Sequence, residues 1–244
     1  MSDDRRAPIN AAEAVYYHND VFGSKILVQT VASHLGESVL EVGAGAGFIT
    51  RELAKCARHI IALEPTGGPH SKLVKNIASL ANVIAHQQTL KSFVVERNRA
   101  SQAMPTFDSV VYINVLEHIE DDVAELGLTN SLLDPGGRVV IVVPAHQWLY
   151  SKVDWLTGHF RRYSKKSLRD VVQAAGLRIL DIRYFDTVGL IPYLVIYKWL
   201  RSTQTDGANA TVYSRLILPV SALLYRFSGG RLIGKNLIAV AVRG

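Results

Sequence analysis

Five runs rich in valine and isoleucine recur between the start of the chain and Ala145, and within each run hydrophobicity is nearly continuous rather than alternating. Uninterrupted apolar runs of this length are typical of parallel strands that are covered on both faces. The pattern therefore predicts strands over residues 38–44, 59–65, 82–88, 107–114 and 137–145.

Between these strands, apolar residues recur at helical spacing. The pattern predicts helices over residues 48–57, 70–80 and 121–133, the last closed by "DPGG". Strands that alternate with helices at this spacing indicate a doubly wound α/β sheet.

After residue 145 the rhythm changes. A loop over 145–163 leads to a helix that Ser164 caps and Gly176 ends. Strand-like runs follow at 177–185 and 236–243, separated by a segment that is too apolar for a plain loop. We expect a helical hairpin at about 189–232, inserted before the last strand.

The length of 244 residues fits a single domain over 1–244. We divide it into three parts: an N-terminal helical cover (1–35), a half that contains a glycine-rich loop for a first ligand (36–145), and a second half on the side of that ligand's reaction partner (146–244). The single cysteine, Cys56, excludes an internal disulfide and suits a reducing, cytoplasmic location.

Charge is divided unevenly along the chain. Residues 150–244 hold 15 Lys and Arg against five Asp and Glu, whereas residues 1–149 hold 12 against 16. This imbalance favours an acidic partner such as a phosphate or an anionic lipid surface, or simply a solvated basic face. No nucleic-acid-binding motif is present, so we expect no nucleic-acid partner.

The start of the chain lacks the apolar core of a signal peptide. The longest uncharged runs, 187–197 and 216–225, fall short of the roughly 20 residues that a membrane span needs. The segment 187–227 remains a candidate for peripheral membrane contact or for homo-oligomer formation.

The stretch "VLEVGAGAGF" (39–48) holds three closely spaced glycines after the first predicted strand. The dinucleotide pattern G-x-G-x-x-G fails in both registers, because Phe48 or Thr50 stands where the third glycine belongs. The Gly-Lys-Ser/Thr of a phosphate loop is also absent. What remains is E-x-G-x-G-x-G, which begins at Glu41.

This motif resembles the first motif of class I S-adenosylmethionine-dependent methyltransferases, and "FDSVVYINVLEH" (107–118) and "LDPGGRVVIVVP" (133–144) resemble later motifs of that family in the same order. The resemblance implies a Rossmann-like, seven-stranded sheet, mostly parallel with an antiparallel last strand, and S-adenosyl-L-methionine as cofactor. The acidic residue after the second strand, Glu64, would accept the ribose hydroxyls. The cofactor-binding residues that the resemblance implies are Glu41, Gly43, Gly45, Gly47, Glu64, Pro65, Thr89, Leu90, Asn114 and Tyr16.

A wider likeness, from "INVLEHIEDD" (113–122) to "GKNLIAVAVR" (234–243), resembles a bacterial methyltransferase group associated with glycan, lipid or natural-product pathways. That group has no single substrate. The likeness implies O- or N-methylation of a small molecule such as a natural product, sugar or glycan precursor. The alternative is an anionic or lipid-linked acceptor, methylated at a membrane surface.

Methyl transfer needs alignment of the reactants above all, and a base helps when the acceptor is a hydroxyl. Ligands of such sheets bind at the carboxyl ends of the strands, where His146 follows the fifth strand. We expect His146 to be the base, with Tyr150 and His159 as further candidates; a purely structural His146 is an equal alternative.

Two further clusters are candidates for acceptor binding. "GHFRRY" (158–163) contains Arg161 and Arg162, which can bind an anionic group or hold the loop in place. Because neighbours on an extended chain point oppositely, at most one of the two faces the cleft. In "YYHND" (16–20), Tyr17 and His18 would contact the acceptor, with simple packing as the alternative.

Glu117 and His118 resemble part of a magnesium-binding motif of quinone-pathway methyltransferases, but Asn114 stands where a further carboxylate belongs. Two ligands rarely hold Mg²⁺, so we expect no metal. A non-catalytic protein of the same fold and an oxidoreductase are the remaining alternatives.

Overall fold

The computed structural model of the chain describes residues 21–99, 106–200 and 212–244. The segment that carries Tyr16, Tyr17 and His18 lies outside these residues, and so do the contacts predicted for it.

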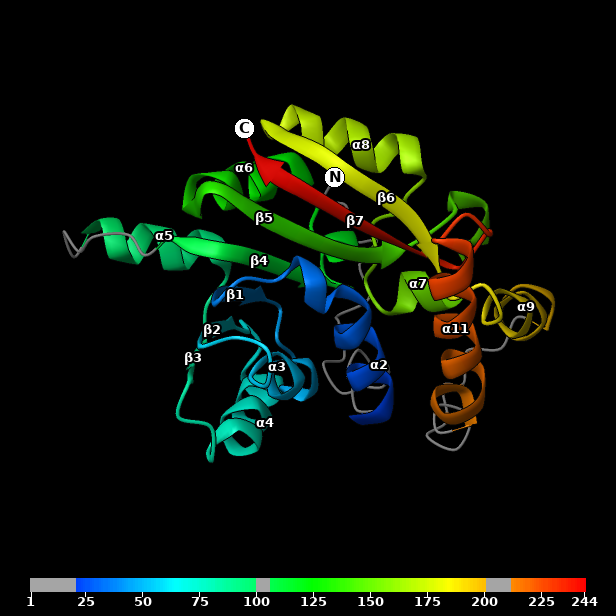
Figure 1. Ribbon diagram of the computed structural model, residues 1–244, viewed down its shortest axis with the longest axis horizontal. Coiled ribbons are helices and arrows are strands. Elements are labelled where there is room, and N and C mark those ends of the chain that lie inside the picture. The colour runs from blue at the N-terminus through cyan, green and yellow to red at the C-terminus, as the bar shows by residue number, and fades with distance from the viewer. Residues whose placement is uncertain (1–20, 100–105, 201–211) are drawn as a thin grey trace, which may run out of the picture.

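The centre of the molecule is one seven-stranded sheet with the order β3-β2-β1-β4-β5-β7-β6 (Figure 1). All neighbouring strands are parallel except that β7 runs antiparallel to both β5 and β6. This confirms the predicted fold class. The strands are β1 (Ser38–Val42), β2 (His59–Leu63), β3 (Val83–His86), β4 (Phe107–Ile113), β5 (Leu133–Pro144), β6 (Leu177–Phe185) and β7 (Asn236–Arg243).

Helices cover both faces of the sheet, as Figure 1 shows. They are α2 (Val21–Val31), α3 (Phe48–Leu53), α4 (Gly67–Ile77), α5 (Leu90–Arg99), α6 (Asp122–Leu132), α7 (Lys152–Leu156), α8 (Lys165–Ala174), α9 (Leu190–Tyr193) and α11 (Leu218–Ser228). Short 3₁₀ turns are η2 (Ala32–His34), η3 (Leu116–His118) and η4 (Gln147–Leu149). Two π-helical segments extend the hairpin, η5 (Leu194–Trp199) and η6 (Tyr213–Ile217).

The strands are continuously hydrophobic because helices cover both faces of the sheet. Leu40 packs in a core cluster with Leu126 of α6 and Leu168 of α8. Its neighbour Val39 points to the other face and packs in a cluster with Val28 of α2. Consecutive strand residues therefore both need apolar side chains.

Element boundaries differ from prediction by a few residues. The helix predicted over 48–57 ends at Leu53, and the helix predicted over 70–80 begins at Gly67. The strand predicted from 137 begins earlier, because Leu133 pairs with Phe107 across a β-bulge. Helix α5 was not predicted, since its sequence is largely polar.

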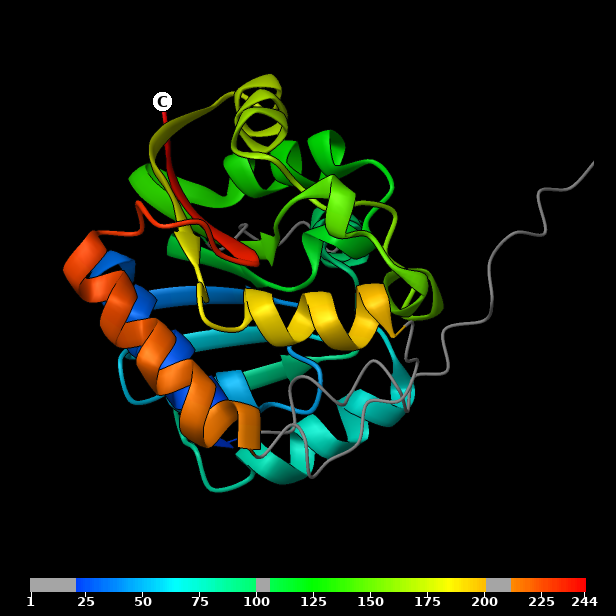
Figure 2. The ribbon, with the colours of Figure 1, turned by 90° about the vertical axis from the view of Figure 1, so that its right-hand side faces the viewer.

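The insertion before the last strand is helical, as expected. The buried Asp186 binds both helical parts of this insertion. The Asp186 carboxylate accepts hydrogen bonds from the backbone N–H of Gly189, just before α9, and from Ser221 Oγ of α11. Figure 2 shows α11 and the helix formed by α9 and η5 on the same side of the molecule. In the described segments, no helix combines the length and apolarity needed to cross a bilayer.

Candidate active site

The glycine loop leaves β1 with three residues at positive φ, and the three glycines serve different needs. A side chain at Gly43 would clash with Val115 at 2.4 Å, and one at Gly47 would meet Leu73 at 2.7 Å. An added Cβ at Gly45 meets nothing within 4 Å. Within this loop, Gly45 therefore presents bare backbone to open space, where a ligand can approach.

Glu64, directly after β2, is bonded to this loop. One carboxylate oxygen accepts from the Gly45 N–H at 2.9 Å and the other from the Thr66 N–H at 2.8 Å. Each oxygen of a carboxylate can accept a second hydrogen bond. The carboxylate is thus held by backbone donors with acceptor capacity left for paired hydroxyls, while Pro65 beside it is exposed.

Glu41 lies buried behind the same loop, and its Oε2 has no hydrogen-bond partner among the described residues. Burial, with a further contribution from the nearby Glu64 carboxylate, raises the pKa of Glu41 to about 7. A buried acceptor without a partner, next to open space at Gly45, fits a ligand that brings a polar or cationic group into this crevice.

Glu41→Gln should stabilise the protein at high pH. Between its ordinary pKa of 4.5 and about 7, the folded state holds the Glu41 proton more tightly than the unfolded chain does, so stability falls as pH rises through that window. In urea unfolding at pH 8, we expect the variant to gain about 3 kcal/mol over wild type, and little at pH 4.5. An equal gain at both pH values would contradict the assignment.

Thr89 and Leu90, two of the residues that the resemblance assigns to the cofactor, have structural partners of their own. Thr89 Oγ1 accepts from the Ser92 N–H in the first turn of α5, and Leu90 is fully buried in the core.

Asn114 follows β4 at a φ of 52° and donates its N–H to the carbonyl of Val142 in β5. It precedes Val115, the residue that touches Gly43. Asn114 also lines a pocket, so the glycine loop and this pocket adjoin at the end of β4.

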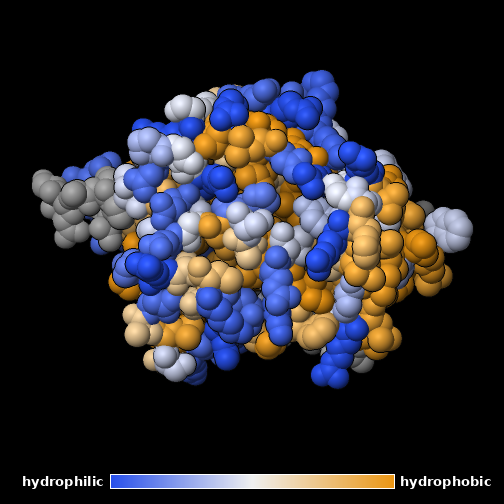
Figure 3. Space-filling view, in the orientation of Figure 1, coloured by the Kyte–Doolittle hydropathy of each residue, from blue (hydrophilic) through white to orange (hydrophobic). Residues whose placement is uncertain are grey.

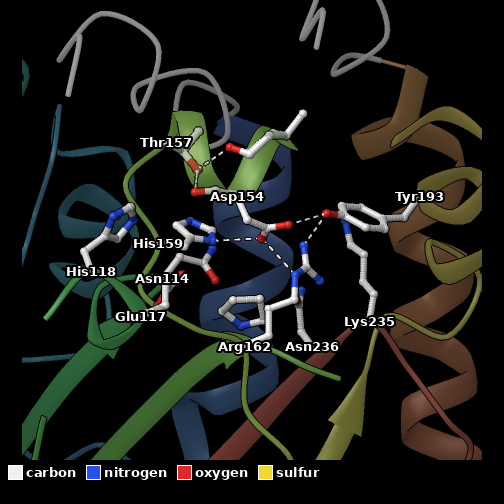
Figure 4. Close-up of a pocket in the computed structure, with 12 residues that line it drawn as sticks. Asn114, Glu117, His118, Asp154, Thr157, His159, Arg162, Tyr193, Lys235 and Asn236 are labelled. Atoms are coloured by element: carbon white, nitrogen blue, oxygen red, sulfur yellow. Dashed lines mark hydrogen bonds and ion pairs between the residues drawn. The ribbon is translucent and has the colours of Figure 1, made fainter. Parts of the chain in front are cut away.

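The pocket lies at the carboxyl ends of β4 and β5 and beside the start of β7, with a cavity of about 100 Å³. Loop residues 151–163 and α9 supply its other walls (Figure 4). Its lining residues are Asn114, Glu117, His118, Pro144, Val153, Asp154, Thr157, His159, Arg162, Tyr193, Lys235 and Asn236.

Asp154 is the centre of a buried hydrogen-bond network in this pocket (Figure 4). Its carboxylate accepts from His159 Nδ1 at 2.9 Å, Arg162 Nε at 2.8 Å and the Tyr193 hydroxyl at 2.8 Å. Burial alone would raise the pKa of Asp154, but the hydrogen bond from His159 and the charge of Arg162 hold it well below its usual range. Asp154 is therefore a fixed anion.

The carboxylate of Asp154 determines which ring nitrogen of His159 can accept a proton. The bond to Asp154 places a proton on Nδ1, so the neutral ring has its lone pair on Nε2. The ring is largely buried and meets His118 edge-on, with centroids 4.6 Å apart. His159 is thus oriented as a proton acceptor in the pocket.

His146 and Tyr150 are directed elsewhere. His146 Nε2 lies 3.1 Å from the Gly234 carbonyl and its ring stacks on Tyr184; burial lowers the pKa of His146. The Tyr150 hydroxyl donates to the His159 carbonyl at 2.6 Å. Neither side chain lines the pocket.

Only one of the two neighbouring arginines lines the pocket, as the alternation of side chains along an extended chain predicts. Arg161 pairs with Asp122 at 2.6 Å, away from the pocket. Arg162 lines the pocket, but its guanidinium is buried and bound to Asp154 and Tyr193. Both are held in structural ion pairs rather than presented to an acceptor.

Glu117, His118 and His159 have ligand-type atoms within 4.8 Å of one another, a spacing that a cation could use. The sequence pattern indicated only the first two, since His159 reaches them through the folded loop. Burial raises the pKa of Glu117 to about 7, and Nδ1 of His159 is already bonded to Asp154.

Sequence reasoning missed Tyr193 and Lys235 as pocket residues. Tyr193 is embedded in an apolar run, and Lys235 lies in the stretch "GKNLIAVAVR" (234–243), whose likeness to the methyltransferase group assigned it no role. Both side chains reach the pocket only because the insertion packs beside the ends of the strands, and no local sequence pattern predicts that packing.

Comparison with known proteins identifies the family and the fold. A family model described as a methyltransferase domain matches residues 22–182. Curated relatives include the ubiquinone biosynthesis O-methyltransferase of Xanthomonas axonopodis pv. citri, 26% identical over 60% of this chain and 65% of that protein. The enzyme of the same name from Cereibacter sphaeroides is 24% identical over 71% of each chain. The match thus spans about two-thirds of the relatives' length.

Solved structures share the fold at low identity. A SAM-dependent methyltransferase from Archaeoglobus fulgidus has a TM-score of 0.61 at 17% identity, covering 93% of this chain and 96% of that one. The N-methyltransferase NodS from Bradyrhizobium japonicum WM9, in complex with S-adenosyl-L-homocysteine, has a TM-score of 0.56 at 13% identity, covering 90% and 84%.

Proposed function

The chain belongs to the methyltransferase-domain family, and from this premise we infer that its glycine-loop crevice takes S-adenosylmethionine and its pocket a small molecule with a hydroxyl group. S-adenosylmethionine supplies an activated methyl group on a sulfonium sulfur. The observation that carries the choice of a hydroxyl is the Asp154–His159 pair in the pocket that adjoins this crevice. The relatives named as O-methyltransferases support the same choice.

The cofactor would be held by groups at the ends of two neighbouring strands. The backbone at Gly45 can approach the ligand closely, Glu64 offers paired acceptors to the ribose hydroxyls, and Glu41 offers a buried acceptor behind the loop. The cluster of acceptors suits a ligand with a positive charge and several donors.

His159 would act as the general base for the acceptor. A hydroxyl within hydrogen-bond reach of Nε2 gives its proton to the ring as its oxygen takes the methyl group. Asp154, which is buried, keeps the ring in the required tautomer and stabilises the imidazolium that forms.

The test is a methyl-transfer assay with S-adenosylmethionine labelled on its methyl group. Phenols, sugars and their amino analogues serve as acceptors. Label transferred to hydroxyl acceptors and not to the matched amines supports the proposal. Failure of S-adenosylhomocysteine to bind in calorimetry would overturn it outright.

Glu64→Ala should weaken S-adenosylhomocysteine binding by about tenfold to hundredfold, because it removes hydrogen bonds to a charged group. Isothermal titration calorimetry measures the change. Glu37→Ala, which removes an exposed carboxylate paired with Arg58, is the matched control and should bind as wild type does. Equal affinity of the Glu64 variant would refute the ribose assignment.

A further inference from the structure

The helix formed by η6 and α11 exposes an apolar stripe, while its buried side combines Leu218 with two serines. The residues on its inner side include Ser214 at 2% exposure and Ser221 at 0%. The outer side carries an apolar stripe at intervals of three and four residues, with Phe227 the most exposed at 81%. This stripe consists of Val212, Leu216, Val220, Leu223 and Phe227. Five exposed apolar side chains in a single stripe indicate that this face of the helix contacts an apolar partner.

A second stripe lies on the neighbouring helix. Ile191, Val195 and Trp199 are spaced at one-turn intervals along α9 and η5, and Trp199 is 83% exposed. Both helices lie on the same side of the molecule (Figure 2), and Figure 3 shows a continuous hydrophobic band over the side that carries α11. We call the residues of these two stripes the apolar band.

Cations surround the apolar band. Lys198 and Arg215 are exposed on the two helices, and Arg226 and Arg231 are exposed at the end of α11. Next to Phe227 lies an open hollow of about 490 Å³ that is lined by Lys165, Arg183, Arg226 and Arg231. Asp181 supplies the single carboxylate of this lining, and it is already paired with Arg183.

We propose that the apolar band docks on an anionic lipid bilayer, with a lipid phosphate seated in the basic hollow beside Phe227. Apolar side chains flanked by cations are the arrangement that the interface of an anionic membrane favours. A second copy of the chain fits less well, because a twofold contact through the band would bring the two sets of cations together.

Docking of this kind places the active site beside the membrane. Helix α9 presents Ile191 outward, while Tyr193, two positions further along, is 6% exposed and lines the pocket. One short helix therefore forms both a pocket wall and the lipid-facing surface. Together with the proposed function, on which this step rests, the inference makes the acceptor a hydroxyl compound that resides in or at the lipid bilayer.

The experiment is co-sedimentation of the full chain with vesicles of phosphatidylcholine and phosphatidylglycerol, mixed at a molar ratio of about seven to three, and with vesicles of phosphatidylcholine alone. We expect wild type to bind the anionic vesicles at least tenfold more strongly. Phe227→Glu should reduce that binding by about tenfold or more, and Arg226→Ser with Arg231→Ser by about tenfold. Ile84→Glu is the matched control, because Ile84 is 60% exposed on edge strand β3, and it should bind within twofold of wild type.

Trp199 supplies a second readout that does not depend on pelleting. Its fluorescence should shift to shorter wavelength with anionic vesicles, and Trp199→Phe should abolish most of the shift while Trp148 and Trp155 remain.

Wild type that stays in the supernatant at millimolar anionic lipid would overturn the proposal. So would a lipid-free dimer in analytical ultracentrifugation that Phe227→Glu converts to monomer, because that result makes a second copy the occupant. S-adenosylhomocysteine titration of the same proteins separates the two hypotheses: intact binding without vesicle association rejects only the membrane surface.

Discussion

His159→Ala should lower the rate of methyl transfer by about 100-fold or more at saturating S-adenosylmethionine, the range in which a positioned general base contributes. The base has no role in holding the cofactor, so S-adenosylhomocysteine affinity should stay within twofold. Single-turnover kinetics and calorimetry on the same preparation give both quantities.

Three comparisons make that result specific. His146→Ala, which alters a histidine outside the pocket lining, should remain within threefold of wild type. Added imidazole should restore part of the His159→Ala rate, whereas a purely structural role would not be rescued. Loss of the wild-type rate in EDTA, restored by Mg²⁺, would instead assign the Glu117–His118–His159 cluster to a cation and reject the base.

Arg162→Met should destabilise the protein by about 3–5 kcal/mol, because it leaves the buried Asp154 carboxylate with an uncompensated charge. The Asp154 and Arg162 side chains are only 1% and 5% exposed, so solvent cannot replace the lost partner. Urea unfolding at pH 7 measures the difference.

The neighbouring arginine provides the control for this prediction. Arg161→Met breaks the ion pair with Asp122, but the Arg161 side chain is 30% exposed and Asp122 keeps the hydrogen bond from the Tyr163 hydroxyl, so the expected cost is smaller, about 1 kcal/mol. Adding Asp154→Asn to Arg162→Met should recover part of the stability, since the uncompensated charge is then gone. Equal costs for both arginines would show that the network around Asp154 contributes no more than a surface pair.

The sheet could be predicted from sequence because each strand needs apolar residues on both faces, a requirement that Val39 and Leu40 show side by side. The glycine loop was equally readable. The distinction between Gly45 and the two packing glycines was not, since it depends on Val115 and Leu73 from other parts of the chain.

The pocket was less predictable for a physical reason. Its residues come from β4, the 145–163 loop, α9 and the start of β7, and their positions depend on how these segments pack. His146 follows a strand end and was the natural choice of base, yet its positive φ of 64° and its bond to the Gly234 carbonyl turn it toward β6. His159, near the far end of the same loop, is brought to the pocket as the chain returns.

That loop is fastened at both ends to the same strand end: the His146 N–H bonds the Tyr163 carbonyl at 2.8 Å, and the Tyr163 N–H bonds the Pro144 carbonyl at 2.9 Å. The two ends of the loop are consequently set by β5, while Arg161 and Arg162 tie its interior to Asp122 and Tyr193 elsewhere in the chain. A graft of the 147–162 segment from a family member with another acceptor, with Asp154, Arg161 and Arg162 retained, should redirect the chemistry while donor recognition persists.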